Sequence, residues 1–297
     1  MIHTSWLRGA LLVARAELVA MLLGFRVIFL SVLYGGTLAA TFALVLSIFR
    51  AAKEQITKEL GATSGLMDPK TLLDAFIQSD KFQTWVDTEV VTIAKAAGGE
   101  AETLVLAMRA GDLPWPAALG LVVTAMTLPP LLLLISYDRI STDLGTRYVR
   151  FLFQRVHRSA YLAGKLAGQW LIAVVVMLLA SLGLLALGAG VPELEVTPLL
   201  LHLPPVWFGM SLVLLAYLSF FTIFATLFTR PFVVLLVAGF AHFLAGSIAL
   251  FSRFGEVWMG RYDVRISLLQ GPALLLVLAH VLVFALVAFY ILRSRDV

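Results

Sequence analysis

The sequence contains no cysteine, and only 13% of its residues are charged. The absence of cysteine excludes a disulfide framework, a thiolate metal site and a cysteine nucleophile. The scarcity of charge accompanies a hydrophobic content of 61% and a mean hydropathy of +0.96 over 297 residues. Since a water-soluble domain cannot bury that much apolar surface, we expect an integral membrane protein. The net charge of +4 then indicates loops that face the cytoplasm rather than nucleic-acid binding.

Six apolar stretches have the length that a membrane-spanning helix needs, which is about 20 residues for about 30 Å of hydrocarbon. They cover residues 27–49, 116–136, 166–190, 205–228, 232–251 and 272–292. Backbone groups in lipid must pair within their own segment, so each stretch is expected to be a helix. Between the fourth and fifth, Thr229-Arg230-Pro231 predicts a tight hairpin, because proline ends one helix and can begin the next. The predicted fold is an all-α polytopic membrane protein with six transmembrane helices.

Lysine and arginine are distributed unevenly among the short connections. The connection 138–165 contains six of them, whereas 191–204 contains none. Positive residues are enriched on the cytoplasmic side, which places 138–165 and both termini in the cytoplasm. The membrane is expected to be a bacterial-type plasma (inner) membrane. The connections 50–113 and 252–271 are placed outside, although the latter contains three arginines.

Residues 1–26 are expected to form an amphipathic helix on the cytoplasmic membrane surface. Its apolar positions recur at helical spacing, and its arginines lie on another face; these are Leu7, Leu11, Ala14, Leu18, Leu22 and Phe25, with Arg8, Arg15 and Arg26. The alternative is the cytoplasmic start of the first span. Residues 27–297 then form the six-span domain, in which 50–113 is an extracytoplasmic helical insertion. That insertion is either a cap on the membrane domain or a docking surface for an external partner.

The connection 138–165 reads DRISTDLGTRYVRFLFQRVHRSAYLAGK and has two faces at helical spacing. One face is apolar and the other is mostly basic; the apolar positions are Ile140, Leu144, Tyr148, Phe151 and Leu152. Such a segment is either an interfacial helix bound by anionic lipid or a docking helix for a cytoplasmic protein. The periodicity does not distinguish these two roles.

Three elements of this connection resemble the first cytoplasmic loop of ABC-2-type permeases, the membrane subunits of ATP-binding-cassette (ABC) exporters. The elements are Asp143-Leu-Gly-Thr146, Phe151-Leu152 and Arg158-Ser-Ala-Tyr-Leu-Ala-Gly-Lys165. The chain departs from the family pattern at Arg155, where the family has proline, and at His157, where it has serine. Outside this connection the agreement is one of layout: an inner-surface helix, six spans and both termini inside.

The resemblance implies that a separate cytoplasmic ABC ATPase subunit binds ATP and Mg and docks on a coupling helix near 143–153. The residues expected at that interface are Asp143, Gly145, Thr146, Arg147, Tyr148, Arg150, Phe151 and Arg158. A second permease subunit, identical or related, would enclose the transport path. No cofactor and no catalytic residue are expected in this chain. Gly164-Lys165 lacks the upstream glycine and the Ser/Thr of a phosphate-binding loop.

Two further patterns lie within the spans. Small residues recur every fourth position along the first span, which favours close helix packing; they are Ser31, Gly35, Ala39 and Ala43. Ser219, Thr222 and Thr226, together with His242, are candidates for lining a pathway, although hydroxyls in helices commonly bond to their own backbone. His242 and His280 have no histidine or carboxylate three or four residues away, so no metal site is expected.

Two other classes of protein remain open. The first is a non-catalytic membrane scaffold or receptor. The second is an intramembrane serine protease with Ser211 as nucleophile and His280 as base, which requires the two side chains to lie within hydrogen-bond reach. Leucine follows Ser211 where such proteases usually have glycine. No residue identifies a transported substrate.

Overall fold

The computed structural model describes residues 5–60, 115–146, 148–189, 196–251 and 271–295, with the isolated residues 80, 84 and 88. Every regular element within the five ranges is helical, and six helices are long and apolar enough to cross a membrane. The prediction of an all-α, multi-pass membrane protein is therefore confirmed. Arg147, residues 252–270 and residues 61–114 apart from 80, 84 and 88 lie outside the described residues, and with them most of the predicted cap or docking surface.

The six spanning helices match the six apolar stretches. They are α2 (Phe25–Leu60), α7 (Trp115–Ser136), α10 (Arg158–Gly188), α11 (Val196–Leu227), α12 (Pro231–Phe251) and α14 (Gly271–Ser294). Three of them continue past the apolar stretch: α2 at its end, and α10 and α11 at their beginnings. The predicted bounds covered only the apolar part of each helix, because the sequence becomes polar where a helix leaves the hydrocarbon. The predicted hairpin between α11 and α12 is present at residues 228–230.

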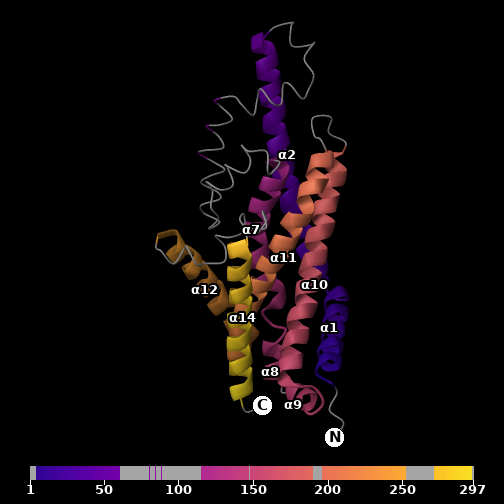
Figure 1. The fold of residues 1–297 in the computed structure, drawn as a ribbon, viewed down its shortest axis with the longest axis vertical. Helices are drawn as coiled ribbons and strands as arrows, with labels where there is room; N and C mark the ends of the chain where they lie inside the picture. Colours follow the sequence, from indigo (N-terminus) through magenta and orange to yellow (C-terminus); the bar gives the residue numbers. More distant parts are fainter. Residues whose placement is uncertain are drawn as a thin grey trace.

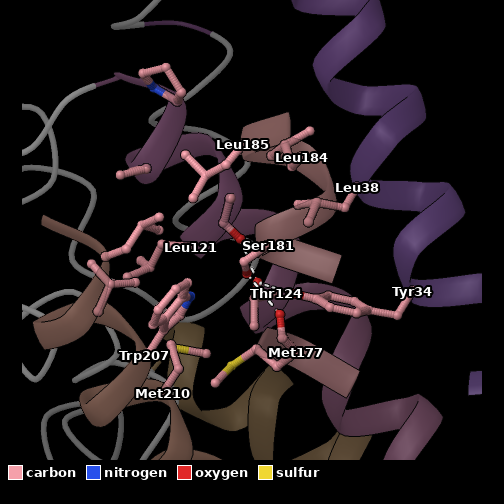
Figure 2. A pocket seen from close by; sticks show the side chains of 15 residues that line it. Tyr34, Leu38, Leu121, Thr124, Met177, Ser181, Leu184, Leu185, Trp207 and Met210 are labelled. Carbon is pink, nitrogen blue, oxygen red and sulfur yellow. Dashed lines mark hydrogen bonds between the residues drawn. The ribbon is translucent and has the colours of Figure 1, made fainter. Parts of the chain in front are cut away.

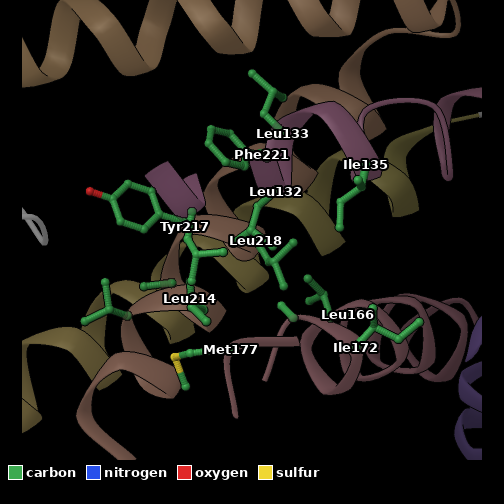
Figure 3. Close-up of a cluster of buried hydrophobic side chains, with 14 of the residues drawn as sticks. Leu132, Leu133, Ile135, Leu166, Ile172, Met177, Leu214, Tyr217, Leu218 and Phe221 are labelled. Atoms are coloured by element: carbon green, nitrogen blue, oxygen red, sulfur yellow. The ribbon is translucent and has the colours of Figure 1, made fainter. Parts of the chain in front are cut away.

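The core lies between α7, α10 and α11, with α2 packed beside them (Figure 1). Of the most apolar part of each span, 59% is buried in α7 and 67% in α11, against 11% in both α12 and α14. Figure 3 shows side chains from the three central helices meeting, among them Leu132, Ile172 and Phe221. The outer spans therefore present apolar faces to lipid or to another chain, and α12 diverges from the bundle (Figure 1).

The N-terminal helix α1 (Trp6–Leu22) is separate from α2, and the Ser5 hydroxyl caps it by accepting from the backbone N–H of Arg8. It runs alongside the first turns of α10 rather than continuing into α2 (Figure 1). Its buried side is made chiefly of small residues and one acid: Gly9, Val13, Ala14, Glu17 and Met21. Leu7, Leu11 and Leu22 are exposed. These three leucines of the predicted apolar face thus point away from the protein, where lipid can cover them, whereas Ala14 is buried and Leu18 is half-buried against the core.

The predicted coupling helix near 143–153 is two short helices, α8 (Ser141–Gly145) and α9 (Tyr148–Phe153). The single continuous apolar face predicted for it was therefore wrong. Ile140 and Leu144 are buried in the core, whereas Tyr148 and Phe151 are exposed. Gly145, at the end of α8, lies against the α11–α12 hairpin, since a Cβ at this position would lie 3.0 Å from the Thr229 carbonyl oxygen.

Candidate functional site

The helix α9 presents an exposed aromatic pair at the end of the bundle where both chain termini lie (Figure 1). Tyr148 is 58% exposed and Phe151 is 70% exposed, and Arg150 between them is also exposed. Val149, on the opposite side, is fully buried. A short helix with a buried base and exposed Tyr, Phe and Arg has the composition of a protein-binding hot spot.

The start of α10 supports α9 from behind. The ring of Phe153 meets the ring of Tyr161 edge-on, with 5.5 Å between their centroids, and the guanidinium of Arg158 lies 5.2 Å from the Phe153 centroid. Arg158 also donates hydrogen bonds to the carbonyl oxygens of Leu292, Arg293 and Arg295 at 2.8–3.1 Å. It therefore caps the C-terminal end of α14, a common role for arginine. Arg158 was predicted to contact a partner, but its bonds lie within the chain, so we expect it to position α9.

Behind α8 lies a group of charged and polar side chains that we call the polar cluster; its members are Glu17, Arg139, Asp143, Tyr161, Lys165 and Gln169. Lys165 lies at its centre, with its Nζ 2.8 Å from Glu17 Oε2 and 2.9 Å from Asp143 Oδ2. The Tyr161 hydroxyl donates to Asp143 Oδ2 at 2.8 Å. The cluster joins four parts of the chain: α1, the turn before α8, α8 itself and α10.

Glu17 is the most buried charged group of this cluster, with 2% of its side chain exposed. Besides Lys165, Arg139 Nε lies 3.4 Å from Glu17 Oε1, and Gln169 Nε2 donates to that oxygen at 3.5 Å. Two carboxylates thus face two cations, and the cluster is neutral overall. Buried charges are tolerated when they are paired and hydrogen-bonded in this way. The sequence placed Glu17 on a helix expected at the membrane surface and gave no sign of its burial.

A pair of glycines in α10 brings α1 close enough to reach the polar cluster. A Cβ at Gly164 would lie 2.6 Å from the Ala10 carbonyl oxygen, and one at Gly168 would lie 2.8 Å from Glu17 Cβ. Glycines four residues apart lie on one helix face and allow two backbones to approach. The sequence-based prediction placed close helix packing on the first span and did not include this Gly-x-x-x-Gly pair. The spacing itself was a readable signal.

A second ionic contact holds the start of α2 against the end of α7. The guanidinium of Arg26 pairs with both carboxylate oxygens of Asp138 and donates to the Ile135 carbonyl oxygen at 3.2 Å. Arg26 was expected on the polar face of the N-terminal helix. It is instead a structural residue of α2.

The small residues of the first span face partly inward and partly outward. Gly35 and Ala39 are half-buried, and a Cβ at Gly35 would lie 3.9 Å from Ala180 Cβ of α10. Ser31 and Ala43 are exposed. The buried positions of α2 are Leu30, Tyr34, Leu38 and Phe42. A role for the small residues in subunit packing stays a prediction.

The candidates for a pathway on α11 are buried, and their hydroxyls bond to the backbone. Ser219, Thr222 and Thr226 donate to carbonyl oxygens three or four residues earlier at 2.7–2.8 Å. This is the plainer of the two roles considered from the sequence. His242 of α12 packs edge-on against Tyr217 and Phe221, with centroid distances of 5.3 and 5.9 Å.

The geometry gives no support to a serine–histidine pair. The Ser211 hydroxyl donates to the Phe208 carbonyl oxygen at 2.7 Å, and His280 Nδ1 lies 2.8 Å from the Leu276 carbonyl oxygen. Each side chain is thus bonded to its own helix. Within the described ranges, no group of three metal-ligating side chains is present.

Comparison with known proteins does not identify a family for this chain. No protein-family model matches the chain, and no curated protein matches it. The resemblance to ABC-2-type permeases therefore rests on the motif within 138–165 and on the membrane layout.

Proposed function

We propose that this chain is the membrane-spanning permease subunit of an ABC transporter, which exports its substrate with ATP hydrolysed by a separate ATPase subunit. The observation that carries the proposal is the exposed pair Tyr148 and Phe151 on α9, within a motif that resembles the coupling loop of such permeases. Exposed aromatics outside the spans favour a protein partner, because large apolar groups are costly to leave in water. The ATPase would bind ATP and Mg, and this chain would bind neither.

The contacts around α9 are those that a docking helix needs to transmit a displacement. Phe153 and Arg158 join α9 to α10 and to the end of α14. The polar cluster joins α8 to α1 and α10. Movement of α9 by a closing ATPase pair would therefore shift α1 and α10 together, and with α10 the core of the bundle. Asp143 and Arg158 act in this proposal as positioning residues behind the docking surface.

The remaining parts of the proposal concern sides and subunits. The end with α8, α9 and both termini faces the cytoplasm of a bacterial-type inner membrane. A second permease subunit packs against the exposed apolar faces of the outer spans. The poor burial of α12 and α14 within one chain supports such a partner.

The test is truncation of the aromatic pair. Tyr148→Ala together with Phe151→Ala is expected to abolish co-purification of an ABC ATPase and substrate-stimulated ATP hydrolysis, since hot-spot truncations cost about 2 kcal/mol or more each. Membrane insertion should be unchanged, because it depends on the hydrophobicity of the spans. Phe208→Ala is the matched control, because Phe208 is 54% exposed but lies on α11, away from α9 and not on an outer span.

The competing roles give different results in the same purification. A lipid-bound interfacial helix predicts that Arg150→Gln with Arg155→Gln weakens binding to anionic lipid while no ATPase accompanies the wild type. A scaffold or receptor likewise predicts recovery without an ATPase. Repeated recovery of the wild type without any ABC ATPase, under conditions that preserve a known ABC complex, would refute the proposal.

A further inference from the structure

A cavity of about 40 Å³ lies between α2, α7, α10 and α11, in the half of the bundle away from α8 and α9 (Figure 2). Its walls are mainly aliphatic and thioether side chains, including Leu38, Leu121, Met177 and Met210. A water molecule needs roughly 10–15 Å³ measured in this way, so the cavity has room for more than one small group. It is unrelated to the docking surface on α9.

Three hydroxyl groups on one side of the cavity already donate their protons to hydrogen bonds within the protein. The Thr124 hydroxyl donates to the Gly120 carbonyl oxygen at 2.5 Å, so the Tyr34 hydroxyl, 2.8 Å from Thr124 Oγ1, must be the donor of that pair. The Ser181 hydroxyl donates to the Met177 carbonyl oxygen at 2.8 Å. Because each hydroxyl has one proton and two lone pairs, the three groups offer lone pairs to the cavity.

Trp207 supplies the complementary group. Its Nε1 is buried and has no hydrogen-bond partner among the described residues. Figure 2 shows the nitrogen-bearing side of the indole directed toward the Thr124 and Ser181 hydroxyls. An unpaired buried N–H is costly, so a group that accepts from it is stabilised here.

Gly120 leaves one wall of the cavity open. A Cβ at this position would meet no atom within 4 Å, although Gly120 lines the cavity on a central helix. The backbone of α7 is thus exposed to the cavity, and any larger side chain at 120 would occupy it. Mainly apolar walls with a few convergent polar groups are the usual form of a small-molecule site.

We propose that this cavity binds the hydroxyl end of an aliphatic alcohol. The hydroxyl oxygen accepts from Trp207 Nε1, and its proton is donated to a lone pair of the three-hydroxyl group. The first carbon atoms of the chain lie among Leu121, Met177 and Met210, because about 40 Å³ is too small for the whole chain. A hydroxyl is the group that uses both the free donor and the free lone pairs. The alcohol is either the free hydroxyl of a membrane lipid or a separate amphiphile. This inference does not depend on the proposed transport function.

The test uses the purified full-length protein in mild detergent with an octanol that carries a photoactivatable diazirine. Saturable labelling is expected on peptides that contain Met177 or Met210. Gly120→Leu should reduce this labelling at least tenfold by filling the cavity. Gly183→Leu is the matched control, since a Cβ there also meets no atom within 4 Å but Gly183 does not line the cavity. Labelling that is absent, or unchanged by Gly120→Leu in a protein that elutes like the wild type, overturns the proposal.

The hydrogen bond is tested separately, with a variant that keeps an aromatic ring. Trp207→Phe should weaken saturation by the octanol probe about fivefold, the value of one neutral hydrogen bond. An octane probe with the same diazirine but no hydroxyl should be affected much less. Equal weakening of both probes overturns the role of Trp207. A probe that never saturates means that the cavity holds water only, which also overturns the proposal.

Competition identifies the source of the alcohol. A monoacylglycerol that displaces the probe more effectively than unlabelled octanol indicates a lipid hydroxyl. The reverse order indicates a separate amphiphile. Failure of both to compete contradicts a specific site.

Discussion

At the scale of single residues, the polar cluster depends on one carboxylate. Glu17 contacts Lys165, Arg139 and Gln169 while nearly all of its surface is buried. Removing one partner of a buried ion pair leaves an uncompensated charge, which costs more than the pair contributes. Glu17 therefore connects α1 to α10 and to the turn before α8.

Replacing Glu17 by glutamine is expected to lower the free energy of unfolding by about 3 kcal/mol, because Arg139 and Lys165 would share Asp143 as their remaining acid. The measurement is the thermal or denaturant midpoint of the purified protein in mild detergent. Arg15→Gln serves as control, since Arg15 is an exposed residue of the same helix. Equal, small effects of the two changes would show that Glu17 is not a structural residue.

Substitutions of Glu17 and Lys165 should also have non-additive effects on the free energy of unfolding. In a double-mutant cycle with Glu17→Gln and Lys165→Met, we expect a coupling energy of about 1–3 kcal/mol, since the two groups are in direct contact. Lys165→Met alone should be damaging, because it removes the cation that Glu17 and Asp143 share and leaves buried Glu17 with Arg139 as its remaining cation. A coupling energy near zero would contradict the 2.8 Å contact.

At the scale of helices, α1 is held to α10 through the glycines 164 and 168. Gly164→Leu is expected to separate the two helices, because its side chain would begin 2.6 Å from a backbone oxygen of α1 that has no freedom to rotate away. The expected result is faster amide hydrogen exchange throughout α1, measured by mass spectrometry. Gly183→Leu, on the same helix but facing open space, should leave α1 protected. Unchanged protection in Gly164→Leu would rule out this close contact.

The first span provides a second test at this scale. Ser31→Leu with Ala43→Leu changes the two small residues that are exposed in one chain, so the fold should persist while contact with a second subunit is lost. Gel filtration in mild detergent should show a smaller particle. Thr37→Leu is the control, because Thr37 is also exposed but lies about 120° around the helix from both Ser31 and Ala43. If both proteins elute like the wild type, this stripe is not a subunit interface.

At the scale of the whole molecule, orientation is the property that the proposed function most needs. The chain contains no cysteine, so a thiol reagent would label only a cysteine that is introduced by substitution. A cysteine in place of Thr197, exposed at the start of α11, should react with an impermeant thiol reagent in intact cells. One in place of Thr142, exposed on α8, should react only after the membrane is opened. The reverse pattern would remove α9 from the cytoplasm and with it the proposed ATPase contact.

The sequence by itself determined the number, the order and the approximate position of the spans. Transfer of a helix into lipid depends on the summed hydropathy of about 20 consecutive residues, which is a local quantity. The hairpin at Thr229-Arg230-Pro231 was equally local, since proline acts on its own backbone. The helical character of α1 was also readable, because it depends on spacing within one segment.

Only the tertiary structure decided how these helices are joined. The approach of Gly145 at the end of α8 to Thr229 joins two residues that lie far apart in sequence. The burial of Glu17 depends on Gly164 and Gly168 of a different helix. The cavity beside Trp207 needs four helices to enclose it. Contacts of this kind are absent from any one segment, because the partners of a side chain are set by helices that meet only after they pack.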